Sequence, residues 1–332
     1  MDITSQARRG HRIAGPPSVS EGARKALSEI EPFGFLPFPE QEDVEGWDRM
    51  IDGVEIYFVE TLPSWIAAAG GSEAQADWEA VDFGNGATGY LVQPHSEGSS
   101  DRILFDIHGG ALIFGKGESC RMFTMWQSFR NNARTYGIDY RMPPHHRYPV
   151  ALDDVVAGYR YLLERYDADR IVISSNSAGG NLAVALILRC REEGLPMPAG
   201  MILQTPEVDL TESGDSFSTM ADIDIGLPPL VAVNRLYANG IDLADPRISP
   251  LFADFDGPFP PTLITVGTRD RFLSNGARLN MALRRAGHHV ELILMDAMPH
   301  GGFGGVDEDR ELWAEARRFA ERAWRGELRR PA

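Results

Sequence analysis

The chain has 332 residues, 43% hydrophobic and 24% charged, a composition typical of a soluble globular protein with a large buried core. Its formal net charge of −16 argues against binding to nucleic acid or to an anionic membrane surface. The two cysteines, Cys120 in a polar turn region and Cys190 in an apolar helical pattern, predict a reducing compartment. We find no run of about 18 apolar residues and no signal-peptide pattern, so we expect a cytoplasmic protein without a membrane span.

Residues 1–75 differ in composition from the rest of the chain. The segment EPFGFLPFPEQEDVEGW (31–47) is rich in proline, phenylalanine and acidic residues, and the region predicts short helices and loops that form a cap segment. Its aromatic residues fit two roles, lining a pocket under the cap or forming the cap's own small core. These residues are Phe33, Phe35, Phe38, Trp47, Tyr57 and Phe58.

From residue 76 onwards, strands and helices alternate. A hairpin with its turn at Gly84-Asn85-Gly86 comes first. Further strands are predicted at 102–108, 136–141, 170–174, 199–205, 261–267 and 290–295, and helices at 120–135, 151–166, 178–194, 275–287 and 307–328. This alternation indicates an α/β fold, with a mostly parallel central sheet and helices on both faces, over residues 76–332. Residues 207–243 interrupt it, and we expect them to form a second cap insertion over the sheet edge.

Ser177 lies at the predicted turn between a strand and a helix, in ISSNSAGGNL (173–182). The residues around it match the nucleophile-elbow pattern G-x-S-x-G, except that Ser175 replaces the first glycine. Small residues suit this turn because the serine backbone is strained and the helix passes close to the strand. The pattern predicts that Ser177 is a nucleophile; the alternative is that it only caps the helix.

A serine hydroxyl needs a base, and Asp270 and His300 follow Ser177 in the chain order of a Ser-Asp-His triad. Both come after predicted strands, at the carboxyl ends where ligands bind in open α/β sheets. The competing acid, Asp296, is only four residues before His300 and fits a local structural role. The other histidines lie in polar segments, in a proline-rich loop or at the opposite sheet edge: His11, His95, His145, His146, His288 and His289.

The sequence His108-Gly109-Gly110-Ala111 follows the strand predicted at 102–108 and is similar to the HGGG-type loop that supplies oxyanion donors. Glycines let backbone N–H groups point into the site, and alanine keeps its own N–H. Ala178, directly after Ser177, would supply a further donor. The alternative for this loop alone is a plain glycine turn.

Five segments together resemble the hormone-sensitive-lipase-type esterases, which are α/β-hydrolases that include many bacterial carboxylesterases. These segments are HGGA (108–111), DYRMPPHHRYPVALDD (139–154), NSAGGN (176–181), DPRISPL (245–251) and PHGGF (299–303), and the similarity covers about residues 78–325. The resemblance implies an α/β-hydrolase fold in which Ser177 is the nucleophile, His300 the general base and then acid, and Asp270 the residue that orients His300.

The resemblance also implies an oxyanion hole made by the N–H groups of Gly110, Ala111 and Ala178. Gly109 would shape this loop and His108 would support it without taking part in the chemistry. The two cap segments would cover the acyl and alcohol pockets. A small-molecule ester with a short- to medium-chain acyl group is the expected substrate, no metal or organic cofactor is expected, and a homodimer is one expectation because dimers are common in the family.

The chain departs from the family pattern at positions that shape the site. Ser175 and Asn176 stand where the family has glycine and then aspartate or threonine, Ala111 replaces the third loop glycine, and His145 replaces the acid of the YRLAPE segment. After Asp270 the chain reads RFLSN where the family often has a leucine and another acid. No triad group is removed, so these departures concern pocket shape and rate.

Two other functions stay open at this point. An amide or lactone hydrolase, or a lyase acting on a specialised small molecule, could use the same residues because fold and triad do not choose the substrate. A non-catalytic ligand-binding protein on the same fold is the second. Plant gibberellin receptors resemble these esterases but lack the catalytic histidine, whereas His300 is present here.

Overall fold

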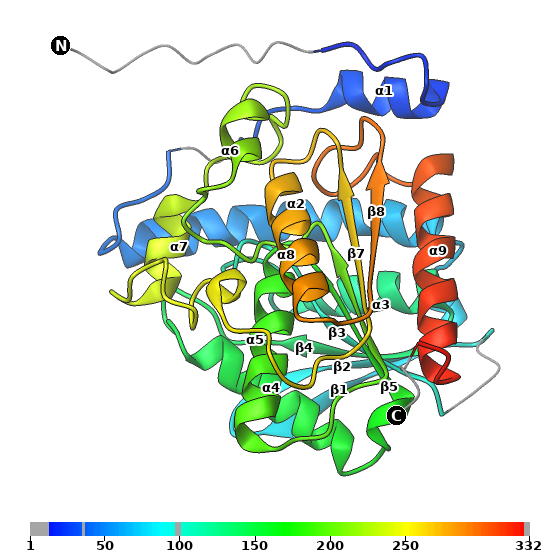
Figure 1. Cartoon of the computed structure of the whole chain (residues 1–332). Helices are drawn as coiled ribbons and strands as arrows, with labels where there is room; N and C mark the ends of the chain where they lie inside the picture. The colour runs from blue at the N-terminus through cyan, green and yellow to red at the C-terminus, as the bar shows by residue number, and fades with distance from the viewer. Residues whose placement is uncertain (1–12, 35–36, 97–100, 329–332) are drawn as a thin grey trace.

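The computed structural model describes residues 13–34, 37–96 and 101–328. At its centre is an eight-stranded sheet in the order β1-β2-β4-β3-β5-β6-β7-β8 (Figure 1). The strands are β1 (Ala76–Gly84), β2 (Ala87–Pro94), β3 (Ile103–Ile107), β4 (Arg134–Asp139), β5 (Ile171–Asn176), β6 (Gly200–Gln204), β7 (Thr262–Gly267) and β8 (Val290–Met295). Only β2 runs antiparallel to its neighbours β1 and β4, so the predicted, mostly parallel α/β sheet is confirmed.

Helices cover both faces of the sheet. The helices of the described residues are α1 (Glu21–Glu29), α2 (Val44–Ala68), α3 (Glu118–Asn131), α4 (Val150–Leu163), α5 (Ala178–Glu193), α6 (Asp215–Thr219), α7 (Val231–Ala238), α8 (Leu273–Arg285) and α9 (Asp307–Trp324), with short 3₁₀ turns η1 (Glu73–Gln75), η2 (Ala168–Arg170) and η3 (Pro250–Phe252). Side chains alternate between faces along a strand. On β3, Phe105 therefore joins the core under α4, α5 and α8, and Leu104 joins the core under α9.

Within the described ranges, no helix combines the length and apolarity of a membrane span.

The prediction of short helices in the N-terminal region is wrong for α2, which is one helix of 25 residues. The Asp43 carboxylate begins it by accepting the Gly46 N–H at 2.9 Å. Buried side chains then recur at helical spacing and hold the helix against the sheet domain despite the internal Pro63. They are Trp47, Ile51, Val54, Leu62 and Ile66.

The aromatic residues near α2 mostly form a core. Trp47 is fully buried, and Phe33 and Phe38 pack in the same cluster, with ring centroids of Phe38 and Trp47 5.8 Å apart. Tyr57 is 53% exposed and lies outside that cluster. Phe35 lies outside the described residues. Phe58 packs against the same cluster, so for four of the six aromatic residues the core role predicted as one alternative is the one observed.

The chain between β6 and β7 carries α6, α7 and η3. In Figure 1, α6 lies on the side of the sheet toward which the arrows of β7 and β8 point. Val233 of α7 packs with Trp47 and Ile51 of α2 and with Phe114, which follows β3, in a single apolar cluster. Two segments far apart in the sequence thus meet over the loop after β3.

Candidate active site

Ser177 occupies a strained turn between β5 and α5. Its backbone has φ 51° and ψ −125°, a conformation that costs of the order of 1–3 kcal/mol for a residue with a side chain. The turn is held by a hydrogen bond from the Ser177 N–H to the Gln204 carbonyl at 2.9 Å. Close packing explains the small neighbours: a Cβ atom added to Gly179 would lie 2.0 Å from the Ile107 carbonyl oxygen. This is the elbow geometry that the sequence predicts.

Ser175 fits the position where the family has glycine. It lies in β5, is fully buried, and its hydroxyl donates to the Ile202 carbonyl at 3.4 Å. Because Ser175 has ordinary strand geometry, the elbow does not need glycine at this position.

Replacing Ser175 with glycine should therefore change kcat by less than about tenfold, or about 1.4 kcal/mol of transition-state free energy. The reason is that the 3.4 Å hydrogen bond from Ser175 ends on a strand carbonyl and not on a reacting group. Steady-state kinetics and thermal unfolding would measure both effects. Ser174→Gly, at the adjacent buried position of β5, measures how much a glycine in this strand by itself changes kcat and thermal stability. A collapse of kcat in Ser175→Gly, with Ser174→Gly unaffected, would assign the hydroxyl a specific role in the reaction.

His300 links Ser177 to Asp270. The His300 Nε2 atom lies 2.9 Å from the Ser177 Oγ atom, and its Nδ1 atom lies 3.1 Å from Asp270 Oδ1. Since the carboxylate can only accept, Nδ1 carries the ring proton and Nε2 is free to accept the serine proton. Asp270 is fully buried, and the Phe272 ring packs edge-on against the imidazole with centroids 4.8 Å apart. These contacts fix the orientation of the imidazole.

The competing acid and histidines lie elsewhere. Asp296 accepts a hydrogen bond from the Ser18 hydroxyl at 2.6 Å in an exposed region. His145, which replaces the family's acid, has its Nε2 atom 3.0 Å from Asp48 Oδ1 and so connects its loop to α2. His11 lies outside the described residues. Of the predicted alternatives, the geometry brings only Asp270 and His300 to Ser177.

The electrostatic environment keeps His300 basic. Burial by itself would lower the pKa of His300, but the neighbouring carboxyl groups together outweigh burial and hold the pKa above its ordinary value of 6.5; Asp270 contributes most, followed by Asp224 and Glu207. A higher pKa makes the imidazole a stronger proton acceptor.

The loop after β3 has the backbone of a donor cradle. Gly110 has φ 115°, and a Cβ atom there would lie 2.2 Å from the Phe114 carbonyl oxygen, so only glycine fits. Ala111 also has positive φ, at 53°, so it takes the backbone shape of the missing glycine at some cost in strain. Gly110 accepts the N–H of Phe114 at 2.8 Å, which closes the loop.

Three backbone donors near Ser177 stay free. The N–H groups of Gly110, Ala111 and Ala178 have no acceptor among residues 13–34, 37–96 and 101–328. Ala178 is the first residue of α5, where helix geometry leaves the N–H unpaired. The Gly109 N–H differs because it donates to Asn176 Oδ1 at 2.9 Å. Gly109 thus fits a role in loop shape rather than in oxyanion binding, and Asn176 holds the loop against the elbow.

His108 stabilises the loop after β3. Its ring stacks on Tyr140 with centroids 4.2 Å apart, and its Nδ1–H donates to the Gly109 carbonyl at 2.7 Å. The Tyr140 hydroxyl donates to the His108 carbonyl at 2.9 Å. Burial lowers the pKa of His108 to about 4, so the imidazole is neutral near pH 7.

Asp224 is a site residue that the sequence analysis missed. It belongs to the segment between α6 and α7, is 1% exposed, and accepts the Arg271 N–H at 2.9 Å through Oδ2. Burial raises the pKa of Asp224 to about 6, with a further rise from Asp270, while the backbone N–H groups of Arg271 and His300 lower it. The Asp224 carboxyl group therefore interacts with the loop that carries Asp270 and with the loop that carries His300. No local pattern marks it, because its partners are distant in the sequence.

Glu207 is a second buried acid that was missed. Its N–H donates to the Ser177 carbonyl at 3.0 Å, and its side chain is fully buried. Neither carboxyl oxygen has a hydrogen-bond partner among the described residues, and burial raises the pKa of Glu207 to about 8. A protonated carboxyl group is the form expected near pH 7. An acid directly after Pro206 at a strand end was the only sequence signal.

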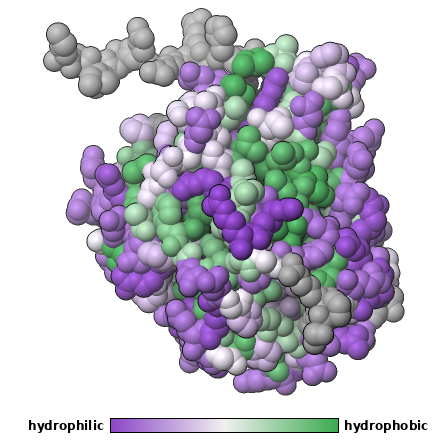
Figure 2. Space-filling view, in the orientation of Figure 1, coloured by the Kyte–Doolittle hydropathy of each residue, from purple (hydrophilic) through white to green (hydrophobic). Residues whose placement is uncertain are grey.

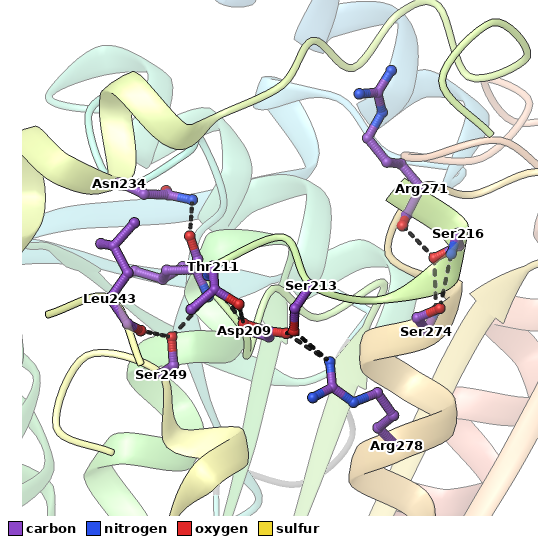
Figure 3. Close-up of polar contacts among 11 residues, drawn as sticks. Asp209, Thr211, Ser213, Ser216, Asn234, Leu243, Ser249, Arg271, Ser274 and Arg278 are labelled. Atoms are coloured by element: carbon purple, nitrogen blue, oxygen red, sulfur yellow. Dashed lines mark hydrogen bonds and ion pairs between the residues drawn. The ribbon is translucent and has the colours of Figure 1, made fainter. Parts of the chain in front are cut away.

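Polar contacts anchor the segment after β6 to the sheet domain (Figure 3). The buried Asp209 carboxylate accepts the Ser213 hydroxyl at 2.7 Å and the Arg278 guanidinium of α8 at 2.6 Å. Ser216 of α6 donates its hydroxyl to the Arg271 carbonyl at 2.6 Å and accepts the Ser274 N–H at 2.9 Å. These bonds fix the chain that follows Asp270.

The contacts of Asp224 predict a positioning role. In Asp224→Ala, kcat should fall by about 10- to 100-fold, since a buried hydrogen bond to a charged group contributes about 1.5–3 kcal/mol. KM should change little because Asp224 faces the loops and not the substrate. Asp222→Ala removes a nearby exposed carboxylate and should leave kcat unchanged. Partial recovery in Asp224→Asn, which keeps one acceptor oxygen, would separate positioning from general loss of structure; equal kcat in all three variants would contradict the role.

Comparison with known proteins agrees with this geometry. Residues 104–303 match the family model described as the α/β-hydrolase fold. An esterase from Acinetobacter venetianus is 34% identical over 207 residues, which cover 61% of this chain and 68% of that protein. The crystal structure of one esterase superposes with a TM-score of 0.82 at 28% identity, covering 96% of this chain and 98% of the other. An esterase of the bacterial hormone-sensitive lipase family gives a TM-score of 0.72 at 25% identity, with 91% and 96% coverage.

The chain belongs to the α/β-hydrolase fold family. The similarity to hormone-sensitive-lipase-type esterases and the expected enzyme class, a carboxylesterase, are confirmed by these relatives.

Proposed function

We propose that the enzyme cleaves carboxylic esters through an acyl-enzyme formed on Ser177. The Ser177 oxygen attacks the ester carbonyl while His300 Nε2 takes its proton, and His300 then returns that proton to the departing alcohol. Water, deprotonated by the same nitrogen, releases the acid and regenerates the serine. Asp270 keeps the imidazole in the required tautomer and stabilises the imidazolium that forms.

The continuous hydrogen-bonded chain from Ser177 through His300 to Asp270, at 2.9 and 3.1 Å, carries this proposal. The unpaired N–H groups of Gly110, Ala111 and Ala178 support an oxyanion hole beside it, where one donor typically contributes about 3 kcal/mol to transition-state stabilisation. In this proposal Gly109 shapes the donor loop, residues 108–111, and His108 supports it.

The pH dependence of kcat/KM should report His300. Because carboxyl groups raise its pKa, the acidic limb of the profile should have its midpoint above 6.5, and activity should be lost as the pH falls through it. Glu207 carries a proton near pH 7, so Glu207→Gln exchanges one neutral group for another and should leave the acidic limb in place. Measuring initial rates with one ester across buffers of constant ionic strength would check both. A midpoint below 6.5 in the wild type would contradict the assignment to His300.

The substrate class is proposed as short- to medium-chain acyl esters. A series of p-nitrophenyl esters of increasing acyl length would define the preference, and matched anilides and lactones would test the amide and lactone alternatives. Labelling by a fluorophosphonate probe separates an enzyme from a non-catalytic binding protein. Turnover confined to the anilides or lactones would replace the ester proposal.

The division into segments and the assembly stay predictions. We propose that residues 1–75 and 207–243 form the cap, supported by the joint packing of α2 and α7 over the donor loop. Apolar side chains gather over the edge strand β8, where Leu294 is 53% exposed, and this supports a homodimer (Figure 2). The two free, buried cysteines are compatible with the predicted cytoplasmic location.

A further inference from the structure

Three side chains with metal-binding chemistry converge beside the donor loop. A ring nitrogen of His108, the Cys120 sulfur and a carboxylate oxygen of Asp139 all lie within 4.8 Å of one another. His108 follows β3 and Asp139 ends the adjacent parallel strand β4, while Cys120 lies in the first turn of α3. Cys120 is 1% exposed, so it is not the turn residue that the sequence suggested. The cluster is assembled by the fold and not by sequence spacing.

His108 has one ring nitrogen with an unused lone pair. Its Nδ1–H donates to the Gly109 carbonyl, so the other ring nitrogen, Nε2, is the acceptor of the neutral ring. His108 is 1% exposed, and Nε2 has no hydrogen-bond partner among the described residues. Leaving a buried polar atom unpaired is unfavourable. A histidine bound to a metal commonly donates its second nitrogen to a backbone carbonyl, which is the arrangement seen here.

Asp139 gives the cluster a route to solvent. Its Oδ2 atom accepts the Gly117 N–H at 3.0 Å, which orients the carboxylate. Asp139 also lines a surface pocket of about 590 Å³ together with the acids Glu55 and Glu118. A cation could enter through this acidic pocket, and a water molecule from it could complete the coordination.

We propose that His108, Cys120 and Asp139 form a binding site for Zn²⁺ beside the donor loop. One nitrogen, one sulfur and one oxygen suit Zn²⁺, whereas Mg²⁺ and Ca²⁺ prefer oxygen ligands alone. Bond lengths of about 2.0–2.3 Å place the ligand atoms of a tetrahedral zinc roughly 3.3–3.8 Å apart. The widest separation in the cluster, up to 4.8 Å, therefore has to close by at most about 1.5 Å. The simpler role, a Cys120 thiol packed against His108 in a polar core, is the outcome against which the site is tested.

The test uses Co²⁺ as a spectroscopic substitute for Zn²⁺ on the metal-stripped full-length protein. A thiolate ligand gives cobalt an intense near-ultraviolet charge-transfer band, so the wild type should show one that saturates at one Co²⁺ per chain and disappears when Zn²⁺ is added. Cys120→Ala should lose the band. Cys190→Ala is the matched control and should keep the band, because Cys190 is also buried and free but belongs to no such cluster within residues 13–34, 37–96 and 101–328.

A second variant tests the oxygen ligand. Asp139→Asn should weaken Zn²⁺ binding at least tenfold by calorimetry while leaving the far-ultraviolet circular dichroism unchanged. The site is rejected if the wild type lacks the band, if Cys120→Ala keeps it, or if Asp139→Asn binds Zn²⁺ as tightly as the wild type. All readouts are independent of ester hydrolysis, so either proposal can fail alone.

Discussion

Ser177→Ala is expected to lower kcat for p-nitrophenyl butyrate by about 10⁴- to 10⁶-fold. The hydroxyl 2.9 Å from His300 Nε2 is the only side-chain group that forms a bond to the acyl carbon in the proposed mechanism. Any activity left would come from the free N–H donors and from substrate positioning. Steady-state rates, together with mass spectrometry after fluorophosphonate treatment, would measure the loss.

The matched control for this variant is Ser174→Ala, which removes another buried hydroxyl near the end of β5. It should keep both turnover and probe labelling. If Ser177→Ala hydrolysed the ester at the wild-type rate, or if the probe modified another residue in the wild type, Ser177 would not be the nucleophile.

Asp270→Asn is expected to lower kcat by about 10⁴-fold while the protein remains folded. Its Oδ1 atom accepts both the His300 ring proton, at 3.1 Å, and the Phe272 N–H, at 2.7 Å. An amide can present its NH₂ group to Nδ1, and this would favour the tautomer with the proton on Nε2, which cannot accept the serine proton. The pH profile should also change, because the main group that raises the pKa of His300 is lost.

Asp296→Asn is the natural comparison, since Asp296 was the rival acid and lies four residues before His300. The Asp296 carboxylate accepts the Ser18 hydroxyl and, within the part of the chain that the structure describes, forms no hydrogen bond with His300, so kcat should stay within about twofold of the wild type, a change of less than ~0.5 kcal/mol in activation free energy. If Asp296→Asn lowered kcat more than Asp270→Asn did, Asp296 and not Asp270 would be the acid that orients His300.

Local sequence patterns were sufficient for the sheet, the turn at Ser177 and the glycine-containing loop after β3, because each depends on neighbours in the chain. Short apolar runs locate β3, β5 and β7, and small residues around Ser177 are required by the close approach of α5 to β3. The order of Asp270 and His300 after their strands then follows from parallel topology, which brings carboxyl ends together.

The features that escaped prediction depend on distant contacts. Short helices were predicted where α2 forms one long helix, because the apolar stripe from Trp47 to Ile66 holds it by packing despite the internal Pro63. Asp224 and Glu207 gain their importance only from burial beside loops that lie far away in the sequence. Burial of Cys120 likewise depends on where α3 meets β3 and β4.

The packing of α2 against the donor loop limits how the substrate range of this enzyme can be altered. Ile51 and Val54 share a cluster with Ala111 and Phe114, so exchanging the whole N-terminal segment for that of a relative would remove one wall of the loop that is proposed to bind the reacting carbonyl. Mutant libraries that keep this inner face constant and vary the outward-facing Ile56 and Tyr57, which are 60% and 53% exposed, would leave that wall intact. Chimeras that carry the N-terminal segment of a relative should lose turnover even on esters that both parents hydrolyse.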